Sequence, residues 1–141
     1  MVQEGSDLIS ILDEKRRYKY LSPAYHTVLG LQLDVMTGTK ALERIHEEDR
    51  ERVAQTSALL QTQKRVEYLP YRYRAGNDQY RWLESVATNL IDDLAIEGIL
   101  YNSKDITERI NYIQAIEEQN TNSAKSPGSS RIWSGHQSLV Y

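Results

Sequence analysis

Two long apolar segments in the second half of the chain constrain its fold most. Residues 65–74 and 80–91 are rich in Tyr, Val and Leu, and Ala75-Gly76-Asn77-Asp78 between them is a typical hairpin turn. A third strand is predicted over 97–103. Strands in sequence joined by short turns form an antiparallel sheet. Pro70 cannot donate a ladder hydrogen bond, so its strand is predicted to lie at a sheet edge or to contain a bulge there.

The first third of the chain predicts a hairpin and a short helix. Residues 7–13 and 16–21 are expected to pair around the polar turn Glu14-Lys15. Ser22-Pro23 is a strong helix start, with serine as the cap and proline at the first helical position. Gly30 is expected to end that helix, whose buried face would carry Tyr25, Val28 and Leu29.

Two further helices are predicted before the long strands. One covers 37–45, with Leu42 and Ile45 three positions apart, and the other runs from about 46 to 61. The acids at 47–49 suit the positive end of the second helix. Two strands, short helices and then three strands predict an α+β fold. It would have one five-stranded antiparallel sheet with helices on one face.

The chain is predicted to finish with a helix and a polar tail. Residues 107–120 are helical in pattern, and Ile106, Ile110, Ile113 and Ile116 form an apolar stripe. The run over 121–130 is polar with Ser, Pro and Gly, and residues 121–141 are predicted to be a disordered tail.

Composition excludes several classes of function. The chain has 141 residues, enough for one domain, and its net charge of −3 gives no reason to expect nucleic-acid binding. It has no cysteine, which rules out zinc–thiolate sites, thiol nucleophiles and flavins that form a cysteine adduct. No apolar run approaches the roughly 20 residues of a membrane helix, and residues 1–7 lack signal-peptide order. A cytoplasmic location is therefore expected.

Side chains that could carry catalysis or hold a metal are sparse. The three histidines, His26, His46 and His136, do not stand at metal-ligand spacing. His26 is the one haem-ligand candidate, but a partly exposed helix histidine is the simpler interpretation. His46 is expected to organise its turn. The acids Glu47, Glu48, Asp49 and Glu51 are interpreted as a solvated helix start rather than as catalytic carboxylates.

Several strings, taken in order, resemble a PAS domain of the PAS fold type 3 found in bacterial sensor histidine kinases. The resemblance covers about residues 7–109. It rests on Tyr20-Leu21-Ser22-Pro23, Val28-Leu29-Gly30, His46-Glu47-Glu48-Asp49-Arg50, Tyr71-Arg72-Tyr73-Arg74, Tyr80-Arg81-Trp82-Leu83-Glu84 and Asp105-Ile106-Thr107-Glu108-Arg109.

The resemblance implies a sensory domain over 7–106 and a signalling helix over 107–120. Glu84, Asp105, Ile106 and Thr107 would relay a shift of the sheet to that helix across a homodimer. Read locally, Thr107 is merely a helix cap. The chain would not be an enzyme, because the kinase segments would belong to a longer parent protein. The alternative function is a structural dimerisation module without a ligand.

Five residues are candidates for a ligand pocket: Tyr25, Leu29, Leu42, Ile45 and Tyr73. The sequence has ten Tyr and no Phe, so a pocket among them would be small and partly polar. The same residues can equally be plain core, which is the simpler interpretation. The ligand and any cofactor remain unspecified.

The tail also has a second interpretation at the level of codons. With suitable synonymous codons, residues 122–141 read in another frame give a segment that resembles the phospho-accepting helix of the same kinases. Loss of one base at position 122 would produce the observed tail, with Ile132 in place of the acceptor histidine. His136 is therefore not a phosphoacceptor candidate. Sequencing of the coding DNA tests this interpretation.

Overall fold

The computed structural model describes residues 7–123, which form two compact units that divide after Asp105. The second unit holds the helix α4, Thr107–Ser123. The elements of the first unit are, in chain order, β1 (Leu8–Leu12), β2 (Tyr18–Leu21), α1 (Ala24–Thr27), α2 (Leu33–Met36), η1 (Ala41–Arg44), α3 (Glu47–Ala58), η2 (Leu59–Gln61), β3 (Arg65–Arg74), β4 (Tyr80–Leu90) and β5 (Gly98–Asp105).

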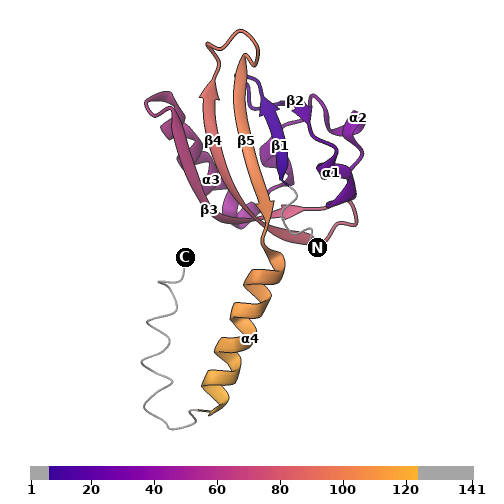
Figure 1. Cartoon of the computed structure of the whole chain (residues 1–141), viewed down its shortest axis with the longest axis vertical. Coiled ribbons are helices and arrows are strands. Elements are labelled where there is room, and N and C mark those ends of the chain that lie inside the picture. Colours follow the sequence, from indigo (N-terminus) through magenta and orange to yellow (C-terminus); the bar gives the residue numbers. More distant parts are fainter. Residues whose placement is uncertain (1–6, 124–141) are drawn as a thin grey trace. The chain divides into compact units, whose positions relative to one another are not determined.

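The five strands make one antiparallel sheet, as the sequence predicts, and their order in the sheet is β2-β1-β5-β4-β3 (Figure 1). The first strand of the chain therefore lies between the second and the last. Each of the longer strands is paired almost throughout, and the β4–β5 register runs from Leu83 opposite Asp105 to Leu90 opposite Gly98.

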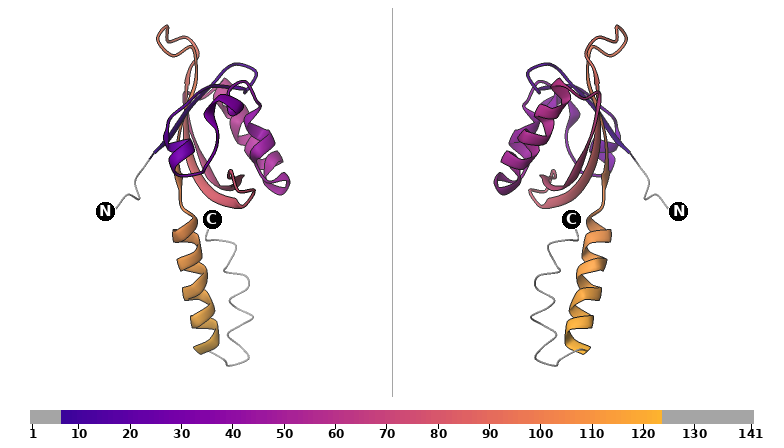
Figure 2. Two further views of the ribbon diagram at one scale, coloured as in Figure 1. Left: turned by 90° about the vertical axis from the view of Figure 1, so that its right-hand side faces the viewer. Right: turned by 90° about the vertical axis from the view of Figure 1, so that its left-hand side faces the viewer.

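Helix α3 lies across one face of the sheet (Figure 2). Alternate strand residues point to this face and form the core, because successive side chains of a strand point to opposite faces. In β1 the buried positions are Leu8, Ser10 and Leu12, and in β4 Leu83 and Ala87 are almost fully buried. Val53 of α3 is buried against this face.

Loop segments cover both edges of the sheet. At β3, His46 N–H donates to the Arg72 carbonyl at 2.9 Å. At β2, Tyr18 N–H donates to Thr39 O at 3.0 Å, and its carbonyl accepts from Gly38 N–H at 2.8 Å. Exposed strand edges invite pairing with other chains, and these bonds occupy part of each edge.

Pro70 lies both in an edge strand and at a bulge, the two locations that the sequence predicts as alternatives. β3 is an edge strand, and its register against β4 shifts between Tyr68 and Tyr71. The missing N–H of Pro70 is thus placed in a bulge, where no ladder bond is lost.

The short helices differ from the sequence prediction in detail. The Ser22 hydroxyl does not cap α1; it accepts a hydrogen bond from Ile9 N–H at 3.1 Å and ties the helix start to β1. Val28, expected on the buried face, is exposed. The helical stretch predicted over 37–45 is only partly correct: α2 ends at Met36, Gly38 turns the chain at φ +89°, and helical structure in that stretch is limited to the 3-10 helix η1. The backbone bonds of 38–41 to β2 prevail over local helix preference there.

The β3–β4 turn packs directly against the end of α1. Gly76 N–H donates to Leu29 O at 2.8 Å, and a Cβ at this position would lie only 2.0 Å from the Gly30 carbonyl oxygen. Glycine is required here by the close approach of two backbones rather than by its own dihedral angles.

Helix α4 extends to Ser123, beyond the predicted end at residue 120. In the part of the chain that the structure describes, no helix is long and apolar enough to span a bilayer. The tail predictions cover residues 121–141. Of these, residues 124–141 lie outside the described part of the chain.

Candidate functional site: a tyrosine-lined cavity beneath α3

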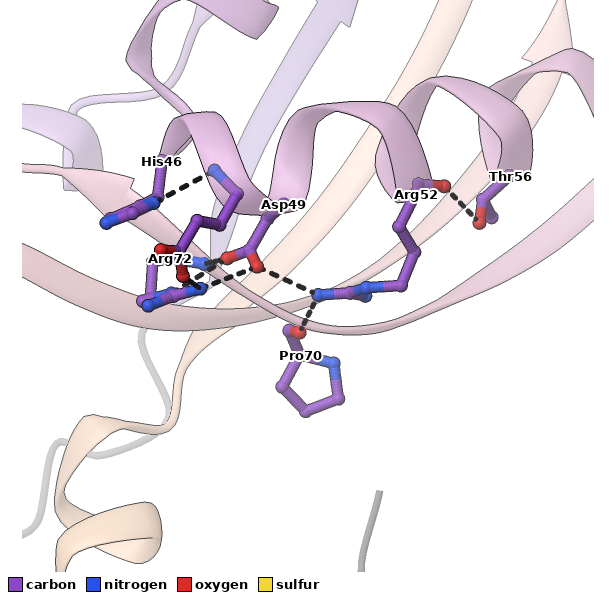
Figure 3. Close-up of polar contacts among 7 residues, drawn as sticks. His46, Asp49, Arg52, Thr56, Pro70 and Arg72 are labelled. Carbon is purple, nitrogen blue, oxygen red and sulfur yellow. Dashed lines mark hydrogen bonds and ion pairs between the residues drawn. The ribbon is translucent and has the colours of Figure 1, made fainter. Parts of the chain in front are cut away.

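The N-terminal end of α3 is fixed to the edge strand β3 by one carboxylate (Figure 3). Asp49 Oδ2 accepts from both the backbone N–H and the Nε of Arg72, at 2.9 and 3.0 Å, and Oδ1 accepts from Arg72 Nη2 at 2.9 Å. Arg52, one helical turn on, places its Nη2 3.5 Å from Asp49 Oδ1 and donates to the Pro70 carbonyl. His46 caps the helix by accepting from Glu48 N–H at 3.1 Å.

Asp49 therefore departs from the prediction of a solvated acidic helix start, since only 5% of its surface is exposed. Burial alone would raise the pKa of Asp49, but the hydrogen bonds and charge of Arg72 outweigh it and hold that pKa below its ordinary value. Its neighbours Glu47 and Glu51 are exposed, as predicted. We call the Asp49–Arg72 contact the α3 anchor.

A cavity of about 190 Å³ lies between the sheet and the C-terminal half of α3. Sheet residues supply much of its polar surface. The residues that line it from β1, β2 and β5 are Ser10, Leu12, Tyr18, Tyr101 and Ser103.

Helical segments and the residues next to them supply most of the remaining wall, which is mainly apolar. α3 and the turn after it contribute Val53, Ala54, Ser57, Ala58 and Gln61, and α1, η1 and the residue after η1 contribute Tyr25, Ala41, Leu42 and Ile45. Three of the five predicted pocket residues, Tyr25, Leu42 and Ile45, thus lie in the cavity wall. Leu29 and Tyr73 do not line it; both are buried and belong to the core.

The tyrosine hydroxyl groups around the cavity are joined in pairs. Tyr18 and Tyr73 share a hydrogen bond of 2.7 Å between their hydroxyls, and Tyr25 packs edge-on against both rings. Burial raises the pKa of the Tyr18 and Tyr25 hydroxyls well above the ordinary value. These groups are therefore neutral donors and acceptors at physiological pH.

Two further hydroxyl chains cross the sheet next to the cavity. Tyr71 bonds to the Ser85 hydroxyl at 2.7 Å, and Ser85 bonds in turn to Ser103 at 2.6 Å. Tyr68 bonds to both Ser57 of α3 and Tyr101 of β5, at 2.6 and 2.9 Å. Ser57, Tyr101 and Ser103 also line the cavity, so a molecule inside it would meet groups that already connect the helix to the sheet.

Arg16 is the one charged residue in the cavity wall among the described residues. It occupies the turn after β1 with φ +65°, a left-handed conformation. Its Nη2 donates to the Ser57 carbonyl at 3.3 Å, whereas its Nη1 is buried and, within residues 7–123, has no hydrogen-bond partner. Sequence reasoning missed this residue because a turn arginine ordinarily points to solvent.

Two of the predicted relay residues, Glu84 and Asp105, lie in the sheet, and the other two follow β5 in the chain. Asp105 Oδ2 accepts from Arg81 Nε of β4 at 2.8 Å, and Glu84 stands opposite Lys104 in the β4–β5 ladder. Ile106 follows β5, and Thr107 is the first residue of α4. The carbonyl of Ile106 accepts the N–H of Ile110 at 3.0 Å.

His26, the haem candidate, is exposed on α1 and does not line the cavity; its Nδ1 lies 3.0 Å from the Leu31 carbonyl. Across residues 7–123, no three His, Asp or Glu side chains gather in a way that could hold a metal ion.

A family model described as "PAS fold" matches residues 18–95, more than half of the chain. The chain belongs to the PAS fold family. As a PAS domain it is a sensory or signalling module, and the five-stranded sheet with short helices agrees with that fold. No curated protein sequence matches the chain significantly.

Solved PAS domains share the fold at low sequence identity. The PAS-B domain of Drosophila melanogaster Cycle, with bound ethylene glycol, is 19% identical at a TM-score of 0.63 and covers 70% of this chain and 98% of its own. A PAS domain from Colwellia psychrerythraea is 17% identical at a TM-score of 0.64 and covers 72% of this chain and 87% of its own. A tryptophan-to-alanine variant of the Cycle PAS-B domain, with bound glycerol, is 22% identical at a TM-score of 0.56 and covers 70% and 96%.

Proposed function

We propose that this PAS domain is the cytoplasmic signal-input module of a two-component sensor histidine kinase. A small ligand in the cavity would shift the sheet and thereby change the signalling helix α4 within a homodimer. The observation that carries the proposal is the path of β5. Tyr101 and Ser103 of this strand line the cavity, and α4 begins two residues after the strand ends.

The last residue of β5 has a contact suited to such a relay. The Asp105–Arg81 ion pair joins β5 to β4 at 2.8 Å, and the Asp105 side chain is only 11% exposed. A change in strand position would alter this contact at the start of the outgoing helix. In a two-state sensor, a ligand shifts output only through a difference in its affinity for the two states.

The experiment is the substitution Asp105→Ala in a full-length protein that carries this domain. We expect the domain to stay folded by circular dichroism and the kinase output to lose its dependence on stimulus. The control is Glu67→Ala, which removes an exposed ion pair with Arg65 on the far strand β3. A stimulus response that survives Asp105→Ala unchanged would contradict the relay.

Dimerisation would use the exposed apolar residues Tyr112 and Ile116 of α4, four positions apart on one helix face. Light scattering on the wild-type chain and on the double variant Tyr112→Ser/Ile116→Ser tests this role, and a wild-type monomer at all concentrations would exclude it. We further propose that the chain itself has no catalytic activity, so incubation with labelled ATP should leave it unphosphorylated.

A further inference from the structure

We propose that the cavity binds a small organic monoanion, with an apolar body in the cavity and its carboxylate on Arg16. This inference deepens the proposed sensory function and rests on it.

The charge of the cavity wall is unbalanced. Its polar groups other than Arg16 are serine and tyrosine hydroxyls and the amide of Gln61, which are all neutral at physiological pH. In the described part of the chain no carboxylate lies within ion-pair distance of Arg16. A guanidinium stays protonated in proteins, so the wall carries one net positive charge.

Arg16 also has a donor to spare. Its Nη2 already binds the Ser57 carbonyl, which holds the guanidinium under the C-terminal half of α3. Its Nη1 is buried with no partner in the described residues, and a buried donor without an acceptor is unfavourable. An anion in the cavity would accept from Nη1 and supply the missing charge through a strong, charge-assisted bond.

The size and lining of the cavity restrict the rest of the molecule. A cavity of about 150 Å³ is enough for benzene, and this one measures about 190 Å³. Aliphatic side chains and tyrosine rings make most of its wall apolar, with Leu12, Leu42, Ile45 and Val53 among the lining residues. A ring or short branched chain with one carboxylate fits, whereas a phosphate or dicarboxylate would leave a second charge unmatched.

Arg17 provides a matched control for Arg16. It is the next residue, and its guanidinium likewise donates to a backbone carbonyl, that of Gly38 at 3.1 Å. It does not line the cavity. Substitution of either arginine removes one positive charge and one bond to backbone, but only Arg16 faces the proposed ligand.

The test is calorimetric titration of the full chain with benzoate and with its neutral counterpart benzamide. We expect benzoate to bind more tightly than benzamide. Arg16→Gln should weaken benzoate by about tenfold or more and leave benzamide nearly unchanged. Arg16→Lys should retain part of the benzoate affinity, and Arg17→Gln should retain all of it. Circular dichroism of each variant checks that the fold is kept.

The outcomes separate this inference from the proposed function. Equal binding of the two probes, with no effect of Arg16→Gln, would contradict the proposal that the ligand is an anion. The proposal that the domain is a ligand-binding sensor would still stand. Binding of benzamide without binding of benzoate would also contradict the proposal of an anionic ligand. If neither probe binds, and mass spectrometry finds no small molecule released on denaturation, the cavity does not serve as a ligand site. In that case both proposals fail together.

Discussion

Helix α3 is tied to the sheet by an arginine at each end, and the two contacts differ in kind. Near its start, Arg72 meets a buried carboxylate and makes three hydrogen bonds with it. Near its end, Arg16 meets only the Ser57 carbonyl and keeps a buried N–H without a partner in the described residues. The first contact is complete within the domain, while the second is completed by something that carries negative charge. The helix is thus anchored at one end and responsive at the other.

Loss of the α3 anchor should have the largest effect on stability. Asp49→Ala removes the acceptor of the Arg72 backbone N–H and Nε and leaves the guanidinium a single acceptor among the described residues, the exposed Glu48 at 3.3 Å, so we expect the free energy of unfolding to fall by about 3 kcal/mol. Urea denaturation measures the loss. Glu51→Ala, an exposed acid of the same helix, should change it by less than about 0.5 kcal/mol. Similar values for the two variants would show that Asp49 does not anchor the helix.

Alkaline pH should destabilise the fold through the tyrosine hydroxyls buried next to the cavity. Burial raises the pKa of Tyr71 to about 12, against 10.0 for a free tyrosine. The unfolded chain therefore loses its proton first, and the stability that Tyr71 contributes is present below pH 10 and lost as the pH rises toward 12. Denaturation at a series of pH values should show a loss of roughly 2–3 kcal/mol from Tyr71, because each pKa unit corresponds to about 1.4 kcal/mol. Tyr71→Phe should reduce the slope; an unchanged slope would contradict the assignment.

Of the two ends of α3, acid should weaken only the one held by Asp49 and Arg72, and the loss of stability should be smaller than that at alkaline pH. The pKa of Asp49 is lowered in the fold, so its contribution is present above the ordinary aspartate value and lost as the pH falls through the folded pKa. The loss should be smaller than that of Asp49→Ala, because a protonated carboxyl still accepts hydrogen bonds. Asp49→Asn should remove part of the acid dependence of unfolding, and Arg16→Gln should leave it as it is in the wild type.

Substitution at the responsive end should have the smallest effect on the free chain. Arg16→Gln removes one bond, from Nη2 to Ser57 O, and relieves a buried donor that has no partner in the described residues. These changes oppose each other, so we expect the free energy of unfolding to change by less than about 1 kcal/mol. Thermal and urea denaturation measure it. A loss as large as that of Asp49→Ala would make Arg16 a structural residue and remove the contrast between the two ends.

The elements predicted best from the sequence are those that local patterns determine. The long strands β3 and β4, their hairpin turn and the setting of Pro70 at an edge and a bulge follow from side-chain alternation and from the missing proline donor. Tyr25 and Ile45 could be assigned to the interior from their spacing, although not to a cavity rather than to core.

The features that escaped prediction depend on contacts between distant residues. Ser22 has the sequence of a helix cap but bonds to β1, and Asp49 has the sequence of a solvated acid but is buried by a strand over twenty residues away. No local sequence pattern indicates that Arg16 lines the cavity. Its side chain reaches α3, which begins at Glu47, from a turn in which Arg16 has a left-handed backbone conformation. Local patterns report which residues are apolar, but not which polar groups will meet.

The order of strands in the sheet has a consequence for folding during translation. Of the five strands, β1 leaves the ribosome first, yet one of its two neighbours is β5, the last of the five to be made. Until β5 emerges, the nascent chain carries the β1–β2 hairpin with one side open, and β4 also lacks a neighbour. Long-range pairing of this kind folds slowly and leaves strand edges exposed meanwhile. The domain should therefore complete its sheet only after β5, which ends at Asp105, has been translated.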